Sequence, residues 1–320
     1  MLSRVADGLY WMSRYVERAE NIARFIDVNE KLTEESESTD SPWAPLIYTT
    51  GDWPLFAERY QSATRDNVLA FLTFDTDYPN SIAACARLAR ENARAVRESI
   101  SSAMWEELNK FYLTMSRAAL ERDPSYLNYE FYNEVKLACH LFRGVTDATL
   151  SRGEGWHFVR LGRLLERADK TSRIVDVKTY GWSSNPDPAQ TPAIVQWSTL
   201  LHSVSALEMY RRLYGRIRPT KVADFLILDC EFPRSIRYCL RGAESSLHAM
   251  TGSSEGTFSN RAEQLVGRLR SQLDFTRIDD ILKEGLHEFI DRLQGDFNQI
   301  GIAIQESFFE VPVSVHSSDE

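Results

Sequence analysis

A charged helical segment occurs twice in this chain. Residues 14–28 read Arg-Tyr-Val-Glu-Arg-Ala-Glu-Asn-Ile-Ala-Arg-Phe-Ile-Asp-Val, and residues 163–177 read Arg-Leu-Leu-Glu-Arg-Ala-Asp-Lys-Thr-Ser-Arg-Ile-Val-Asp-Val. Seven residues agree in register, 149 positions apart, among them the Glu-Arg-Ala core. A chain that carries this segment twice must place two similar charged helices within one fold.

A second repeat follows the first in the same order. Residues 71–87 and 225–241 share Phe, Leu, Asp, Pro, Ser, Ile, Cys and Arg in register, 154 positions apart. Two matches at nearly equal offsets indicate an internal duplication. We therefore expect one domain over residues 1–310, made of two repeats (1–150 and 151–310) related by a pseudo-two-fold axis, and a disordered tail at 311–320.

The repeated segment has one apolar face and one charged face at helical spacing. In the charged face of the first copy, Arg14 lies one turn from Glu17, and Glu20 lies one turn from Arg24. A solvated helix surface is the simplest interpretation of either copy alone. Because the charge order is the same in both, we expect the two faces to be buried against each other or around a shared ligand. A purely structural Glu/Arg lattice and a binding or catalytic site both remain open.

The rest of the chain also has helical periodicity, and no stretch alternates β-forming residues between turn signals. The predicted fold is all-α, a helical bundle of about ten or more helices. Polar or proline-rich loops are expected at 33–42 and 181–192. The main expected helices cover residues 3–30, 84–101, 126–150, a segment from 153, 193–216, 220–228, 235–250, 261–273 and 277–309.

Composition narrows the function classes. The net charge of −9 argues against a nucleic-acid partner, which needs a basic surface. No run of about 18 apolar residues is present to span a membrane, so we expect a cytoplasmic protein. Four dispersed cysteines are typical of reduced, buried thiols. No phosphate-binding glycine loop or metal-ligand cluster occurs, so we expect no cofactor and no metal site.

Other charged residues are weaker candidates. Asp75 and Asp229 lie in the repeated turns before Pro79 and Pro233, where we favour a capping role near helix N-termini over a ligand role. His157 follows Glu154 at a spacing found in di-iron bundles, but no second pair appears. The residues that we expect to bind a ligand are Arg14, Glu17, Arg18, Arg24, Asp27, Arg163, Glu166, Arg167, Arg173, Asp176, His157, Asp75 and Asp229.

Four motifs in order resemble the alpha-E family of bacterial helical proteins, which is named for a Glu-Arg motif and has no established function. They are the Glu-Arg segments at 17–20 and 162–169, residues 89–94 followed by Met-Trp-Glu at 104–106, and Phe-Pro-Arg-Ser-Ile at 232–236. The resemblance covers about residues 1–310. It implies an association with ATP-grasp ligases and transglutaminase-like proteases, and hence a role in amide-bond formation or peptide modification. It supplies no catalytic residue.

Three functions remain open. The first is a non-catalytic partner or substrate-holding subunit of such a ligase. In it, Arg14, Arg24, Arg163 and Arg173 would hold the carboxylates, and Glu17 and Glu166 the amine, of a peptide or amino acid.

The second function is an enzyme that uses Glu17 or Glu166 as a general base, with a pKa raised by burial. The third is a scaffold whose ion pairs only shape the fold. A deep pocket lined by both motifs favours the first two functions, and direct, dry ion pairs favour the third.

Overall fold

The computed structural model describes residues 1–34, 43–121, 127–179 and 191–310. Within these ranges all regular structure is helical and no β-strand occurs, which confirms the all-α prediction. None of the helices in the described ranges combines the length and the apolar character needed to cross a bilayer. The expected loops at 33–42 and 181–192 and the tail at 311–320 lie wholly or mostly outside the described residues.

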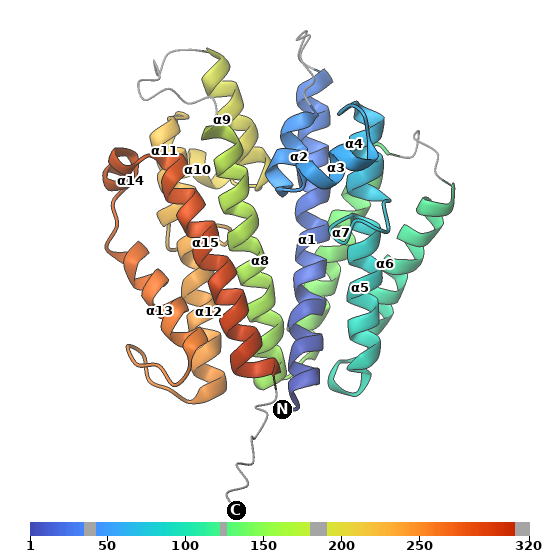
Figure 1. Cartoon of the computed structure of the whole chain (residues 1–320), viewed down its shortest axis with the longest axis vertical. Helices are drawn as coiled ribbons and strands as arrows, with labels where there is room; N and C mark the ends of the chain where they lie inside the picture. Colours follow the sequence, from blue (N-terminus) through green and yellow to red (C-terminus); the bar gives the residue numbers. More distant parts are fainter. Residues whose placement is uncertain (35–42, 122–126, 180–190, 311–320) are drawn as a thin grey trace, which may run out of the picture.

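Two long helices, α1 (Ser3–Glu34) and α8 (Glu154–Thr179), run side by side in the same direction through the middle of the molecule (Figure 1). One group of helices lies on the α1 side of the molecule: α2 (Ala44–Thr50), α3 (Trp53–Arg59), α4 (Arg65–Thr73), α5 (Ile82–Ala95), α6 (Ser102–Glu121) and α7 (Tyr129–Thr149). Of these, α2 also packs on α8.

The other group packs beside α8: α9 (Thr191–Ser203), α10 (Leu207–Tyr214), α11 (Pro219–Leu228), α12 (Ile236–Thr251), α13 (Arg261–Asp274), α14 (Ile278–Glu284) and α15 (Leu286–Ile304). A short 3₁₀ turn at Arg97–Ser99 and a π-helical turn at Gln305–Phe309 complete the described helices.

Corresponding helices of the two groups have corresponding neighbours. In the first group α1 packs on α5, α5 on α6, and α6 on α7; in the second α8 packs on α12, α12 on α13, and α13 on α15. This order agrees with a duplicated bundle. The duplication and its pseudo-two-fold axis stay predictions, to be tested by superposing residues 1–150 on residues 151–310.

The two central helices cross at very short range. A Cβ atom placed on Gly162 of α8 would lie 2.4 Å from the backbone oxygen of Tyr10 in α1, which no side chain tolerates. Nearby, the Ser13 hydroxyl donates a hydrogen bond of 2.7 Å to the backbone oxygen of Val159. Small residues thus bring the two backbones together, and the buried stripes above them, including Ala19 and Ala168, continue the contact.

Two helices that we expected to be continuous are broken. The predicted helix 193–216 divides into α9 and α10 at Ser205, whose φ of 50° is left-handed, and the amide of Ala206 bonds back to the oxygen of Leu201. The predicted helix 277–309 divides into α14 and α15 at Gly285, where φ is 111°. Such a φ is accessible to glycine at little cost, so Gly285 ends one helix and the chain begins the next in a new direction.

The helices that follow the two repeated turns begin later than predicted. Pro79 and Pro233 do not occupy the first helical position; α5 and α12 start at Ile82 and Ile236. Ser81 and Ser235 are the N-caps, and their hydroxyls accept hydrogen bonds from the backbone amides three residues on. The prolines lie in the turn before each helix, and the serines cap the first turn of the helix itself. The predicted helix 84–101 also ends early, at Ala95.

Candidate functional site

The two Glu-Arg motifs bind each other across the α1–α8 contact. Arg167 donates to both carboxylate oxygens of Glu17, at 2.7 and 2.8 Å. In the reverse sense Arg18 donates to both oxygens of Glu166, at 2.6 and 2.9 Å. Both glutamates are fully buried, with 2% and 0% of their surface exposed. The expected meeting of the two charged faces is therefore a pair of reciprocal, forked Glu–Arg contacts.

Each forked pair has further cationic partners. Arg14 adds a hydrogen bond of 2.8 Å to Glu166 and lies over the ring of Trp11 at 4.8 Å. We expected Arg14 to reach Glu17 in its own helix; it reaches Glu166 in α8 instead. Glu17 accepts a hydrogen bond of 3.3 Å from Arg234, which lies in the turn between α11 and α12. The network is thus built between helices more than along them.

Glu20 is the most heavily bonded acid of the site. Arg24 donates to it at 2.6 and 2.9 Å, as the helical spacing predicted. Arg234 and Arg143 donate at 2.5 and 2.8 Å, and Nε2 of His140 lies 2.9 Å away. Four elements, namely α1, α7 and the turns before α10 and α12, meet here, because Arg24 also bonds to Ser205. A single carboxylate therefore ties the two groups of helices together.

The matching acid of α8, Asp169, has fewer partners. Arg173 bonds to it at 3.0 Å and Lys170 at 3.1 Å, both from α8 itself. The turn before α5 contributes Asn80, whose amide oxygen accepts a hydrogen bond of 2.5 Å from Arg18. Asn80 stands at the position that Arg234 holds in the second repeat. An amide in one turn and a guanidinium in the other make the two halves of the network chemically different.

The glutamates of the two motifs are held ionised. Burial raises the pKa of Glu166, but Arg18, Arg14 and Lys170 together outweigh it and hold the pKa well below its usual value. Burial likewise raises the pKa of Glu17, and Arg167 and Arg234 reverse this into a net lowering. The expectation that burial raises the pKa of these glutamates is therefore wrong: strong charge pairing exceeds the desolvation that would have raised it.

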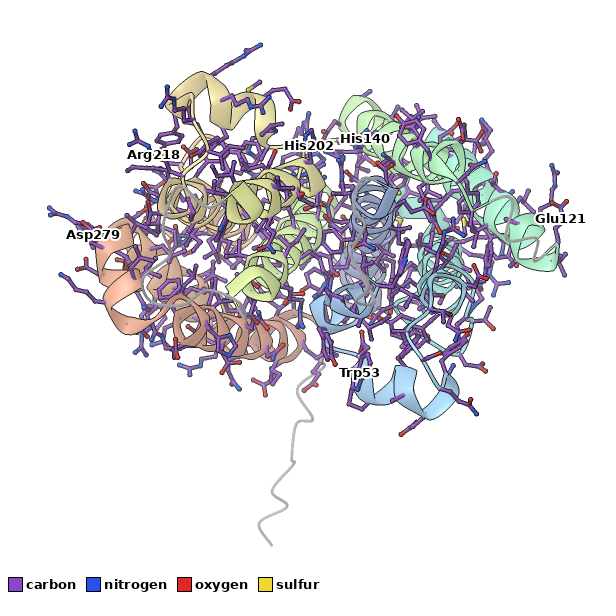
Figure 2. All side chains as sticks on the ribbon, turned by 90° about the horizontal axis from the view of Figure 1, so that it is seen from above. Trp53, Glu121, His140, His202, Arg218 and Asp279 are labelled. Atoms are coloured by element: carbon purple, nitrogen blue, oxygen red, sulfur yellow. The ribbon has the colours of Figure 1, made fainter. Side chains whose placement is uncertain are left out.

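A small cavity adjoins the network. A cavity of about 20 Å³ lies between α1, α7 and α8, lined by Glu17, Glu20, Arg143 and Arg163 among others. This is room for about one water molecule. Two larger cavities, of about 350 and 150 Å³, lie between α6 and α7, and no residue of the Glu-Arg network lines them. Figure 2 shows the dense packing of side chains around the central helices.

Arg163 has the poorest contacts of the predicted arginines. Its closest acid is Asp147, at 3.8 Å, and its buried Nε has no hydrogen-bond partner among the described residues. Burial and the neighbouring Arg167 lower its pKa. The equivalent residue, Arg14, binds Glu166 directly. Arg163 makes no matching contact with Glu17 among the described residues, and Arg234 bonds to Glu17 instead.

The remaining predicted residues lie outside this network. Asp27 pairs with Lys136 of α7 at 2.7 Å, and Asp176 with His287 of α15 at 2.6 Å. Asp75 and Asp229 accept backbone amide hydrogen bonds two and three residues ahead, within the turns between helices. They bind backbone amides, as we favoured, but the helix N-caps themselves are Ser81 and Ser235. His157 stacks edge-on with Trp156, and its Nδ1 has no partner among the described residues.

Sequence reasoning missed several members of the network, among them Arg234, Arg143, His140 and Asn80. His140 and Arg143 lie on α7, and nothing in the spacing of that helix indicates that it faces α1. For Arg234 a signal existed. It follows the proline in the second copy of a repeated turn, as Asn80 does in the first, and both side chains could have been assigned to the charged helices.

The fold and the site define a class of protein: an all-helical domain in which two Glu-Arg motifs on neighbouring helices bind each other. A family model described as Alpha-E, "a predicted alpha-helical domain with a conserved ER motif", matches residues 1–309. The chain belongs to this family.

Several curated proteins are similar to the chain. It is 25% identical to the uncharacterized protein Mb2597 of Mycobacterium bovis and 24% identical to the uncharacterized protein Rv2567 of Mycobacterium tuberculosis. Each alignment spans 291 residues, 84% of this chain and 32% of the relative. The chain thus spans about a third of the length of these relatives. No solved structure matches.

Proposed function

We propose that this protein is a non-catalytic partner subunit of an ATP-grasp-type amide ligase or peptide-modification system, and that its Glu-Arg motifs clamp α1 to α8. One observation carries the proposal: both oxygens of Glu17 and of Glu166 are occupied by arginines of this chain. A general base needs a pKa near the working pH. The pKa of each glutamate is instead lowered by its arginine partners.

The substrate-holding form of the proposal has less support. Arg14, Arg24 and Arg173 already bind carboxylates of the protein itself. The adjoining cavity of about 20 Å³ would have to open before an amino acid could enter. The clamp needs no such opening, because a satisfied buried ion-pair network specifies how two elements pack even where it adds little net stability.

Two observations support a partner role. The resemblance to the family implies ATP-grasp ligases and transglutaminase-like proteases as partners. In the mycobacterial relatives the matching region is about a third of a longer chain, so it is covalently joined to other segments there. A domain that occurs within larger proteins is well suited to act beside an enzyme.

The test measures ADP release and product mass with the protein alone, the ligase alone and both together. We expect no turnover from the protein alone and a faster reaction in the complex. Arg18→Lys retains the positive charge but cannot donate the two parallel hydrogen bonds to Glu166. It should lower the melting temperature, while the folded variant should still speed the ligase reaction as the wild type does. Turnover by the protein alone, lost on Glu166→Gln in a variant shown to be folded, would replace the proposal with the enzyme function.

A further inference from the structure

Four arginines stand exposed within eight residues around α10. Arg211 and Arg212 lie in its last turn, and Arg216 and Arg218 follow it. None of the four side chains makes an ion pair or a hydrogen bond to another described residue. The chain as a whole carries a net charge of −9, so this is a local exception. Figure 2 shows this segment at the edge of the molecule, with Arg218 labelled there.

Helix stability explains only part of this cluster. Cations in a last turn favour the negative end of the helix dipole, which accounts for Arg211 and Arg212. Arg216 and Arg218 lie beyond the helix. Lys221, the next cation along the chain, has a partner in Asp224 at 3.1 Å. Glu208, one turn before Arg211 and Arg212, is exposed as well but makes no ion pair with them. The four arginines outnumber this acid and form a cationic surface, which we call the α10 surface (Arg211, Arg212, Arg216 and Arg218 with Met209 and Leu213).

Exposed apolar side chains lie among these charges. Met209 and Leu213 are 40% and 63% exposed, whereas Leu207 and Tyr210 on the other side of α10 are buried. Arg212 and Leu213 lie three and four residues after Met209, so each is a neighbour of Met209 on the helix surface. Arginine beside exposed apolar residues is the composition enriched in protein–protein interfaces.

From this geometry we infer that the α10 surface docks an acidic amphipathic helix of a partner protein. Carboxylates of that helix would pair with the arginines, and its apolar residues would cover Met209 and Leu213. A membrane or a nucleic acid is a less suitable partner. An extended polyanion meets the acidic remainder of the protein as well, whereas a short acidic helix interacts with charges within a Debye length of about 8 Å. The inference rests on the proposed partner function and gives it a contact surface.

The test uses a labelled synthetic helix with Glu and Leu at helical spacing, measured by fluorescence anisotropy at physiological salt. Arg212→Glu with Arg216→Glu should weaken binding about tenfold or more. The matched control is Arg4→Glu with Arg87→Glu, which reverses two other exposed arginines that make no ion pair with another described residue and changes the net charge equally. It should bind like the wild type. Leu213→Asn should weaken binding at unchanged charge.

Equal affinity of the α10-surface variant and the control variant for the acidic helix would overturn the inference, provided that circular dichroism shows both variants to be folded. So would tighter binding of phosphatidylserine-containing vesicles or of polyuridylate than of the acidic helix. The proposed function is tested separately. If a ligase complex survives reversal of the α10 surface, the surface is wrongly assigned and the partner role stands. If the acidic helix binds there but no ligase complex forms, the surface stands and the partner role fails.

Discussion

Glu17 and Glu166 show how the same residue pair can suggest two different chemistries. A buried carboxylate is a good candidate for a base with a raised pKa, and a carboxylate beside arginine is a good candidate for a permanent anion. The Glu-Arg motif is compatible with both chemistries, so its spacing could not decide between a base and a permanent anion. The deciding fact is the second helix, because the arginine that matters to each glutamate comes from the other copy.

Acid should therefore destabilise the protein through this network. A carboxylate whose folded pKa is lowered binds fewer protons in the folded than in the unfolded state, so its contribution is complete above the unfolded pKa and is lost as the pH falls towards the folded value. We expect the free energy of unfolding to decline below about pH 4.5, the usual pKa of Glu166 and Glu20. The pKa of Asp169 is also lowered, against burial, chiefly by Lys170 and Arg173.

Urea unfolding at a series of pH values checks this expectation. Asp169→Asn removes one of these titrating groups from a part of the network with few partners, so the variant should fold and its stability should fall less steeply below pH 3.8, the usual pKa of this aspartate. Identical slopes for the wild type and the variant would show that Asp169 is not stabilised as an anion.

Among the helices, the contact between α1 and α8 depends on the absence of a side chain at Gly162. A methyl group there would meet backbone, which cannot rotate away, so the helices would have to separate. We expect Gly162→Ala to lower the free energy of unfolding by about 1–3 kcal/mol or more. Gly144→Ala in α7 is the control: nothing lies within 4 Å of its added Cβ, and alanine should stabilise that helix by about 0.5–1 kcal/mol. Thermal melts that rank the two variants in the opposite order would contradict the close approach.

For the molecule as a whole, the sequence predicted the helical class and the meeting of the two charged faces, because both follow from periodicity and repetition. The sequence could not predict the features that depend on tertiary contacts, such as the helix break at Ser205. The break at Ser205 has no local signal, since serine rarely adopts a positive φ, and Arg24 supports it from a helix far away in the chain. The break at Gly285 did have one, because a glycine within a long helical pattern is a common helix end.

The network also limits what the predicted duplication can mean. Asn80 and Arg234 occupy the same position of the repeated turn but differ in charge, and Arg163 is left without the glutamate contact that Arg14 makes. If the two repeats were exact copies, Glu17 and Glu166 would have equivalent hydrogen-bond partners. The side containing Glu17 and Glu20 thus has the larger share of arginines, and Ser205, which bonds to Arg24, lies just before α10 in the chain.

The central claim is that the Glu-Arg motifs are a clamp between α1 and α8, and a double-mutant cycle at Glu17 and Arg167 tests it most directly. Urea unfolding would be measured for Glu17→Ala, Arg167→Ala and the double variant. Each single change leaves a buried charge without its main partner and should cost about 3–5 kcal/mol. The double variant should cost clearly less than the sum, by up to about 3 kcal/mol. Additive losses, or single losses below about 0.5 kcal/mol, would contradict the clamp.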